Sequence, residues 1–140
     1  MTTQTRPLPD AGATGAAETA GAAGGPQGLE EVRGGAAGFD SLLAATPVVL
    51  AEFGADWCPP CRALEPALRR LAAEYAGRAR VVSVDTERYP ALAGRYGVLG
   101  LPTVVVFREG REVSRLLGLR PIGALRQILD GALAGPDGAA

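Results

Sequence analysis

The sequence contains no histidine and no lysine, and it has only two cysteines. Without histidine, the chain lacks the most common general base of serine and cysteine hydrolases and the most common metal ligand. All 14 basic residues are arginine and 15 residues are acidic, so the formal net charge is −1. The arginines do not form the dense basic stripe that nucleic-acid binding requires, so we expect no nucleic-acid partner.

Long apolar runs are also missing. The first ten residues contain two prolines and lack the apolar run of roughly 7–15 residues that a secretory signal requires. No stretch approaches the roughly 18–20 apolar residues of a membrane-spanning helix. We therefore expect a cytoplasmic protein with no membrane partner. In that reducing compartment, a cysteine pair is more often catalytic or metal-binding than a permanent structural disulfide.

Aromatic residues are absent from residues 1–35, which consist mainly of alanine, glycine, threonine and proline. Such a segment can bury little surface, so we predict a disordered tail over residues 1–35. Strongly hydrophobic residues begin at Phe39. The rest of the chain, roughly 100 residues, suffices for one core. We predict a single domain over residues 36–135 and a disordered C-terminus over residues 136–140.

The apolar periodicity predicts alternating helices and strands. The run over residues 48–53 is almost wholly apolar, as expected of a central strand covered on both faces. The run over residues 64–75 has apolar residues at steps of four, three and four, which indicates an amphipathic helix that Pro66 should kink. The expected elements are helices over residues 39–45, 64–75, 90–96 and 122–133 and strands over residues 48–53, 80–85, 103–107 and 112–117.

The order of these elements predicts an α/β fold. A helix between the first two strands is the usual crossover of a parallel pair, whereas the last two strands form an antiparallel hairpin with a turn at Glu109-Gly110. We therefore expect three α/β/α layers, with a central mixed sheet of four to five strands and helices on both faces. The only candidate for the fifth strand is the weak segment Leu29-Glu30-Glu31-Val32.

The two cysteines are three residues apart, in the run Trp57-Cys58-Pro59-Pro60-Cys61. A predicted strand precedes this run and a predicted helix follows it. Two thiols one helical turn apart can change between a dithiol and a disulfide without movement of the rest of the fold. A CxxC motif beside a βαβ pattern is typical of proteins that exchange thiols and disulfides.

From Phe39 to Ala134 the chain resembles the thioredoxin family. Its members carry Trp-Cys-Gly-Pro-Cys, a helix proline five residues after the second cysteine, and a Gly-Ile/Leu-Pro-Thr element. The corresponding positions here are the cysteine run itself, Pro66, and Gly100-Leu101-Pro102-Thr103, whose proline lies 41 residues after Cys61. The hairpin motif Phe-x-x-Gly falls on Phe107 and Gly110, and a late loop glycine falls on Gly118. The resemblance implies the thioredoxin fold.

Several positions depart from the family pattern. The buried acid six residues before the first cysteine is usually aspartate, and here it is Glu52. Family members often have a lysine that pairs with this acid, and the chain has Ser83 at that position. They frequently have a tryptophan two residues after the acid, where the chain has Gly54. Pro59 stands in place of glycine, so replacing it with glycine should shift the reduction potential. These departures leave the predicted fold unchanged and concern the redox tuning.

The resemblance implies a thiol–disulfide oxidoreductase of the protein-disulfide reductase type. Cys58, at a helix start that stabilises its thiolate, would be the nucleophile, and Cys61 would resolve the mixed disulfide. Glu52, if buried rather than exposed at a strand edge, would have a raised pKa and act as the base for Cys61. A cis peptide bond should precede Pro102. The expected substrate-binding residues are Trp57, Pro59, Pro60, Gly100, Leu101, Pro102 and Gly118.

The resemblance also implies the partners. These are disulfide-containing client proteins and thioredoxin reductase, a flavoenzyme that uses NADPH, with the chain itself a monomer. No cofactor or metal is expected, since the redox-active disulfide between Cys58 and Cys61 itself carries the electrons. Three alternatives remain open: a dedicated oxidant, isomerase or relay to one client; a non-catalytic binding module with this fold; and half of a zinc site whose other two ligands come from a second chain.

Overall fold

The structure, a computed structural model, describes residues 28–139, with side chains through residue 135. Most of the predicted N-terminal tail (residues 1–27) lies outside this part of the chain, as does Ala140. The elements alternate along the chain as the apolar pattern predicts. They are β1 (Glu30–Glu31), α2 (Gly35–Ala45), β2 (Val48–Gly54), α3 (Pro59–Glu74), β3 (Arg80–Asp85), α4 (Pro90–Arg95), β4 (Thr103–Arg108), β5 (Arg111–Leu117) and α5 (Ile122–Ala139).

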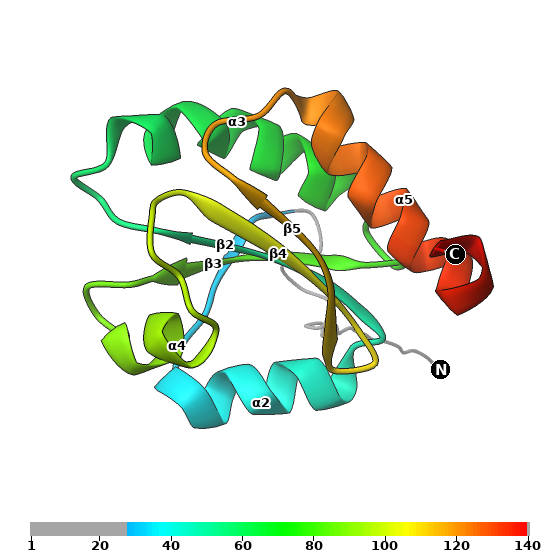
Figure 1. Cartoon of the computed structure of the whole chain (residues 1–140), viewed down its shortest axis with the longest axis horizontal. Coiled ribbons are helices and arrows are strands. Elements are labelled where there is room, and N and C mark those ends of the chain that lie inside the picture. Colours follow the sequence, from blue (N-terminus) through cyan, green and yellow to red (C-terminus); the bar gives the residue numbers. More distant parts are fainter. Residues whose placement is uncertain (1–27, 140) are drawn as a thin grey trace, which may run out of the picture.

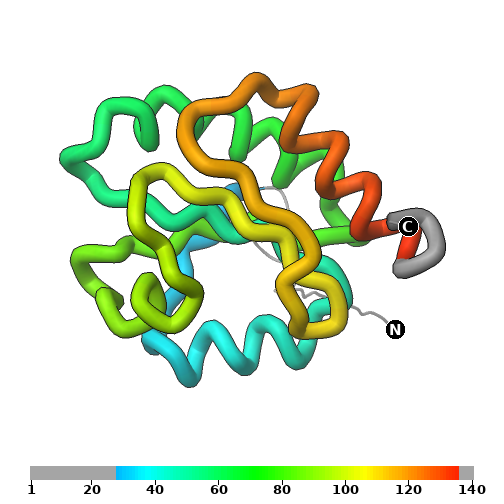
Figure 2. The backbone as a smooth tube through the Cα atoms, in the orientation of Figure 1, coloured from blue at the N-terminus to red at the C-terminus, as the bar shows by residue number. Residues whose placement is uncertain are grey.

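The five strands form one mixed sheet in the order β1-β3-β2-β4-β5. The first three strands of this order run parallel to one another, while β4 runs antiparallel to both β2 and β5. Helices α3 and α5 cover one face of the sheet, and α2 and α4 cover the other (Figure 1). The predicted three-layer α/β/α fold is therefore confirmed. Figure 2 traces how the chain passes from α2 on one face, through β2, to α3 on the other.

The sheet begins earlier in the sequence than the predicted domain start at residue 36. Glu30 and Glu31 pair with β3, and the side chain of Val32 is buried. The Val32 N–H donates a hydrogen bond of 2.8 Å to the carbonyl of Ser83, and Glu30 accepts one from Arg80. Residues 30–32 thus contribute to the sheet, although a two-residue strand has too few residues to show an apolar alternation. The weak first strand of the sequence pattern is β1.

Strand β2 is the centre of the molecule, because all seven of its residues are buried. Its side chains alternate between the two faces. Val48 and Leu50 pack under α3 and α5, in a core with Leu64, Leu68 and Leu125. Val49, Ala51 and Phe53 pack on the opposite side, in a core with the aromatic residues of α2 and its neighbours. Glu52 therefore falls on the face that α3 covers.

The second core is built around Phe39 of α2, whose side chain is completely buried. Its ring meets those of Phe53, Tyr96 and Phe107 in edge-to-face arrangements, with centroids 5.5 to 6.3 Å apart. Aromatic pairs prefer this geometry because the positive edge of one ring faces the negative face of the other. The cluster therefore fixes α2 against the sheet from the side opposite the cysteines.

The two helices on the cysteine side are tied together. The hydroxyl of Tyr75, just after α3, donates a 2.6 Å hydrogen bond to Asp130 on α5, and Arg126 of α5 forms an ion pair of 2.8 Å with Glu74. Pro66 lies inside α3 without ending it. Helix α5 is interrupted at Gly135, whose φ of 91° is not helical, and the predicted domain end coincides with this break.

The two outer strands differ from the central ones. Strand β1 has only two residues, and the register between β4 and β5 shifts at Val106 and Phe107, as in a β-bulge.

Among residues 28–139, no helix combines the length and apolar character needed to cross a membrane.

Candidate active site

The cysteine run occupies the junction between β2 and α3. Cys58 is the N-cap of α3, with an extended backbone, and its N–H donates a 3.1 Å hydrogen bond to the carbonyl of Ala55. Pro59 and Pro60 take the first two helical positions. Proline is favourable at a helix start because the N–H it lacks would have no partner within the helix. The sequence thus starts the helix directly after Cys58, at the helix start expected there and five residues before the apolar repeat begins at residue 64.

Cys58 and Cys61 form a disulfide, with their Cα atoms 5.3 Å apart. The backbone N–H of Cys61 points at the Sγ atom of Cys58 across 3.3 Å. Because Pro59 and Pro60 have no N–H, this group is the only donor among the first three helical positions. Together with the positive end of the helix dipole, it favours negative charge on the Cys58 sulfur.

The segment before β4 lies directly against the disulfide. The Leu101–Pro102 peptide bond is cis, as the resemblance implied, and Leu101 packs against Cys58 and Cys61. The carbonyl of Pro102 accepts a 2.7 Å hydrogen bond from the N–H of Gly118, and the Thr103 hydroxyl donates one of 2.6 Å to the carbonyl of Gly100. These bonds hold the segment in place beside the cysteines.

An open groove of about 540 Å³ runs past the disulfide. Trp57 lies along it with 65% of its surface exposed, so this aromatic residue does not belong to the core. Leu99, which the sequence analysis did not single out, is 99% exposed in the same groove. Of the predicted substrate-binding residues, all but Pro102 and Gly118 line it: Trp57, Pro59, Pro60, Gly100 and Leu101.

Glu52 is buried beneath α3, with 6% of its surface exposed, which excludes the alternative of a carboxylate at an exposed strand edge. Burial raises the pKa of the Glu52 carboxyl to about 7, and the nearby negative charge of Glu65 adds to the shift. Its neighbour on β3 is Ser83, which cannot supply a positive charge. Within the described residues, the carboxylate has no hydrogen-bond partner.

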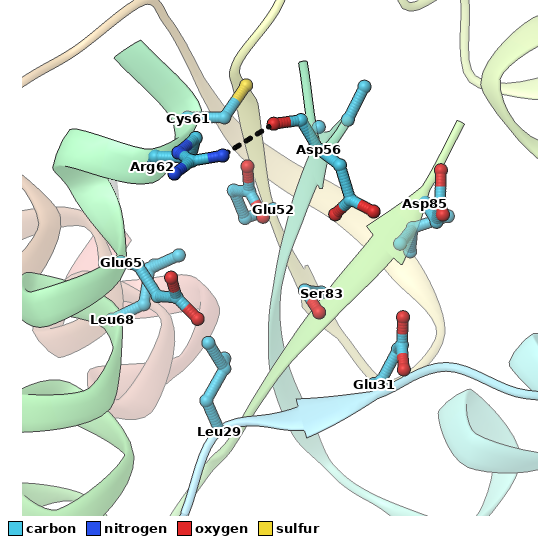
Figure 3. A pocket seen from close by; sticks show the side chains of 13 residues that line it. Leu29, Glu31, Glu52, Asp56, Cys61, Arg62, Glu65, Leu68, Ser83 and Asp85 are labelled. Carbon is cyan, nitrogen blue, oxygen red and sulfur yellow. Dashed lines mark hydrogen bonds between the residues drawn. The ribbon is translucent and has the colours of Figure 1, made fainter. Parts of the chain in front are cut away.

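A cavity of about 110 Å³ lies next to this carboxylate, between α3, β3 and the start of β1. Figure 3 shows Glu52 between Cys61 on α3 and Ser83 on β3, with further carboxylates around the opening. The Arg62 guanidinium on the rim donates a 3.3 Å hydrogen bond to the carbonyl of Asp56. The acidic residues that line the cavity are Glu31, Glu52, Asp56, Glu65 and Asp85.

The structure thus brings the predicted catalytic side chains to one place, with the groove on one side of the disulfide and the cavity on the other. Sequence reasoning missed Leu99 and the cavity residue Glu65. A signal for Glu65 was present, since residues four apart on a helix share a face and Glu65 follows Cys61 by four. The exposure of Leu99 has no comparable signal, because it lies in a loop.

Comparisons with known proteins agree with this geometry. A family model described as Thioredoxin matches residues 32–131. Thioredoxin from Staphylococcus aureus is 38% identical over 94 residues, which cover 67% of this chain and 89% of that protein.

Solved structures give the same result. A mutant thioredoxin from Halobacterium salinarum NRC-1 matches with a TM-score of 0.72 and 37% identity, covering 77% of this chain and 93% of the other. Thioredoxin from Plasmodium falciparum matches with a TM-score of 0.68 and 26% identity, covering 73% and 97%.

Proposed function

We propose, because this chain belongs to the thioredoxin family, that it reduces disulfide bonds in client proteins. The chain is a thiol–disulfide oxidoreductase, and the direction of its reaction and the division of labour between its cysteines are the proposal. The observation that carries it is the Cys58–Cys61 disulfide at the start of α3, beside the cis Leu101–Pro102 bond. This pair can be oxidised and reduced without rearranging the sheet.

In the first step, the thiolate of Cys58 attacks one sulfur of the client disulfide. A bond forms between Cys58 Sγ and that sulfur, the client S–S bond breaks, and the second client sulfur leaves as a thiolate that takes up a proton. The Cys61 N–H and the helix dipole favour the attacking thiolate. The product is a mixed disulfide between Cys58 and the client.

In the second step, the Cys61 thiol passes its proton to the Glu52 carboxylate, and its thiolate attacks Cys58 Sγ. The bond between Cys58 and the client breaks, and the client leaves with its second thiolate, which also takes up a proton. The client has gained two electrons and two protons, and the protein has become the disulfide seen in the structure. A carboxyl group with a pKa of about 7 is suited to accept a proton near neutral pH.

The groove beside the disulfide is the proposed client site. Trp57 and Leu101 line this groove together with Cys58 and offer apolar surface, and the backbone of Leu101 is available to an extended client segment. The chain is then reduced by thioredoxin reductase with NADPH. We propose that it acts as a monomer and in the cytoplasm, where a cysteine pair of this kind is kept reduced.

Two assays test this function. Insulin precipitates when its disulfides are reduced, and the chain should accelerate this precipitation with dithiothreitol as the electron donor. It should do the same with NADPH and thioredoxin reductase as the donor. Acceleration in neither assay would contradict the proposal, and acceleration with dithiothreitol alone would show a thiol carrier that this reductase does not serve.

Single substitutions separate the two cysteines. Cys58→Ser should abolish insulin reduction, because no thiolate remains at the helix start. Cys61→Ser should instead accumulate the mixed disulfide, detected by mass spectrometry as a covalent adduct with the client. A Cys58→Ser protein that reduces insulin as fast as the native protein would refute the assignment of the nucleophile.

A further inference from the structure

Gly54 is the last residue of β2 and is buried directly below the cysteine run. Glycine weakens a strand, because it has no side chain to pack and loses much conformational freedom on folding. Gly54 is absent from the glycines with a positive φ, so its backbone conformation is open to other residues. The reason for glycine at this position must therefore be space.

A side chain at residue 54 would collide with the active site. A Cβ atom there would lie 3.1 Å from Cys61 Sγ and 3.2 Å from Cδ of Glu52, and it would overlap with Oε2 of Glu52. Residues 52 and 54 of a strand point to the same face, so their side chains compete for one volume. The carboxylate of Glu52 fills the volume that a side chain at residue 54 would otherwise take, and this volume borders Cys61 Sγ.

We propose that Gly54 is a positioning residue, which holds open the space in which the Glu52 carboxylate lies beside Cys61 Sγ. The inference rests on the proposed role of Glu52 as proton acceptor and deepens it. Glu52 and Gly54 thus act as one coupled pair, in which the longer acid fits only because residue 54 has no side chain. A larger residue at position 54 would move the carboxylate away from the sulfur and toward the cavity.

Other charged groups around the Glu52 carboxylate also act on its charge. Glu65 and Arg62 face the cavity from α3, and the remaining acids come from three other segments. None of these groups supplies one of the three heavy atoms nearest to the Cβ position of residue 54. The first atoms that a side chain at residue 54 would meet therefore belong to Glu52 and Cys61. The remaining acids are Glu31 before α2, Asp56 after β2 and Asp85 at the end of β3.

The first test is Gly54→Ala. Because the colliding atom is the far end of a flexible side chain, the fold should persist while the carboxylate moves into the cavity. In the oxidised protein, the pKa of Glu52, followed by carbon-13 NMR, should fall from about 7 toward the ordinary carboxyl range, because contact with water in the cavity relieves desolvation, which raises this pKa more than the charge of Glu65 does. An unchanged pKa would overturn the proposed placement.

The second readout is kinetic. A symmetrical aromatic disulfide that releases one coloured thiolate in each step separates attack by Cys58 from resolution by Cys61 in a single turnover. Gly54→Ala should leave the first phase within about twofold and slow the second about tenfold at neutral pH, since a misplaced base loses much of its effect. Gly123→Ala, a helical glycine with nothing within 4 Å of its Cβ position, is the matched control and should change neither phase.

Two double variants complete the design. Combining Gly54→Ala with Glu52→Asp should restore much of the second phase, because the shorter acid leaves room for the methyl group. Adding Gly54→Ala to Glu52→Gln should cause no further slowing, and a further tenfold loss there would show that Gly54 acts independently of the carboxylate. If Glu52→Gln alone fails to slow the second phase, the proposed base is wrong, while the pKa measurement still decides the placement.

Discussion

At the scale of single residues, Glu52 is unusual because it is a carboxylate buried in the protein interior. A carboxylate moved from water into a protein interior loses its hydration, and it stays ionised only if a cation or several hydrogen bonds replace the water. Glu52 faces Ser83 across the strand pair and lies near the acid Glu65. The neutral form is therefore favoured until the pH reaches about 7.

This shift predicts how stability depends on pH. The pKa of Glu52 rises from 4.5 to about 7 on folding, so between these values the folded state holds a proton that the unfolded chain has released. Stability therefore falls as the pH rises through this window, by on the order of 3 kcal/mol at about 1.4 kcal/mol per pKa unit. Urea denaturation of the oxidised protein at several pH values measures the slope.

The matched variant for this prediction is Glu52→Gln, which keeps the shape of the side chain and cannot ionise. Its stability should lack the fall between pH 4.5 and 7 and should exceed that of the native protein at neutral pH. If native and variant proteins showed parallel stability curves, the slope would belong to other groups.

At the scale of helices and strands, Phe39 is the larger of the two buried side chains that hold α2 on the sheet. Phe39 contributes no surface to solvent and touches three aromatic rings. Phe39→Ala should lower the free energy of unfolding by about 3–5 kcal/mol, through lost burial and the cavity left behind. Chemical denaturation followed by circular dichroism checks this value.

The neighbouring Asp40 supplies the control. It forms an ion pair of 2.7 Å with Arg95, and both side chains are largely exposed. Asp40→Ala should change stability by no more than about 1 kcal/mol, because exposed ion pairs contribute little. Equal losses in the two variants would mean that α2 is not held by its aromatic contact.

The central elements could be predicted from the sequence because each carries enough residues to show its periodicity. Strand β2 is uniformly apolar except for Glu52, and α3 repeats leucines along one face. The apolar repeat marks α3 only from Leu64 onward, since the prolines at its first two positions carry no periodic signal, whereas the helix start at Cys58 was expected from the family resemblance. Strand β1 consists of two glutamates and depends on pairing with β3. The local sequence cannot reveal this pairing.

The site was predictable to the extent that motif spacing and the family resemblance define it. The cysteine pair follows from the CxxC spacing, whereas the cis bond before Pro102 was implied by the resemblance to the family. The acidic cavity could not be predicted in the same way, because Glu31 and Asp85 reach it from strands that meet only in the folded sheet. The same holds for Gly54, whose importance depends on where the Glu52 side chain ends.

At the scale of the whole molecule, the N-terminal boundary can be tested by truncation. Removing residues 1–33 deletes β1 and the buried Val32 and should lower the free energy of unfolding by about 2 kcal/mol or more, from lost apolar burial alone. Removing residues 1–27 should leave both stability and insulin reduction unchanged, if that segment is the tail that its composition predicts. Thermal and urea unfolding of the two truncated proteins distinguish these outcomes.

An unaffected 1–33 deletion would show that β3 needs no outer neighbour. A loss of stability on removing residues 1–27 would instead assign that segment a part in the fold. The two deletions therefore locate the boundary from opposite sides.

The shape of the outer strands bears on how the protein behaves in concentrated solution. An unpaired strand can recruit another chain by main-chain hydrogen bonding, which starts intermolecular aggregation. Here the edge strand β1 is too short to pair with another chain. The edge strand β5 carries the charged residues Arg111, Glu112 and Arg115, and its register with β4 is irregular. Crowding should thus favour separate molecules over fibrils, which keeps the groove beside the disulfide free for the proposed clients.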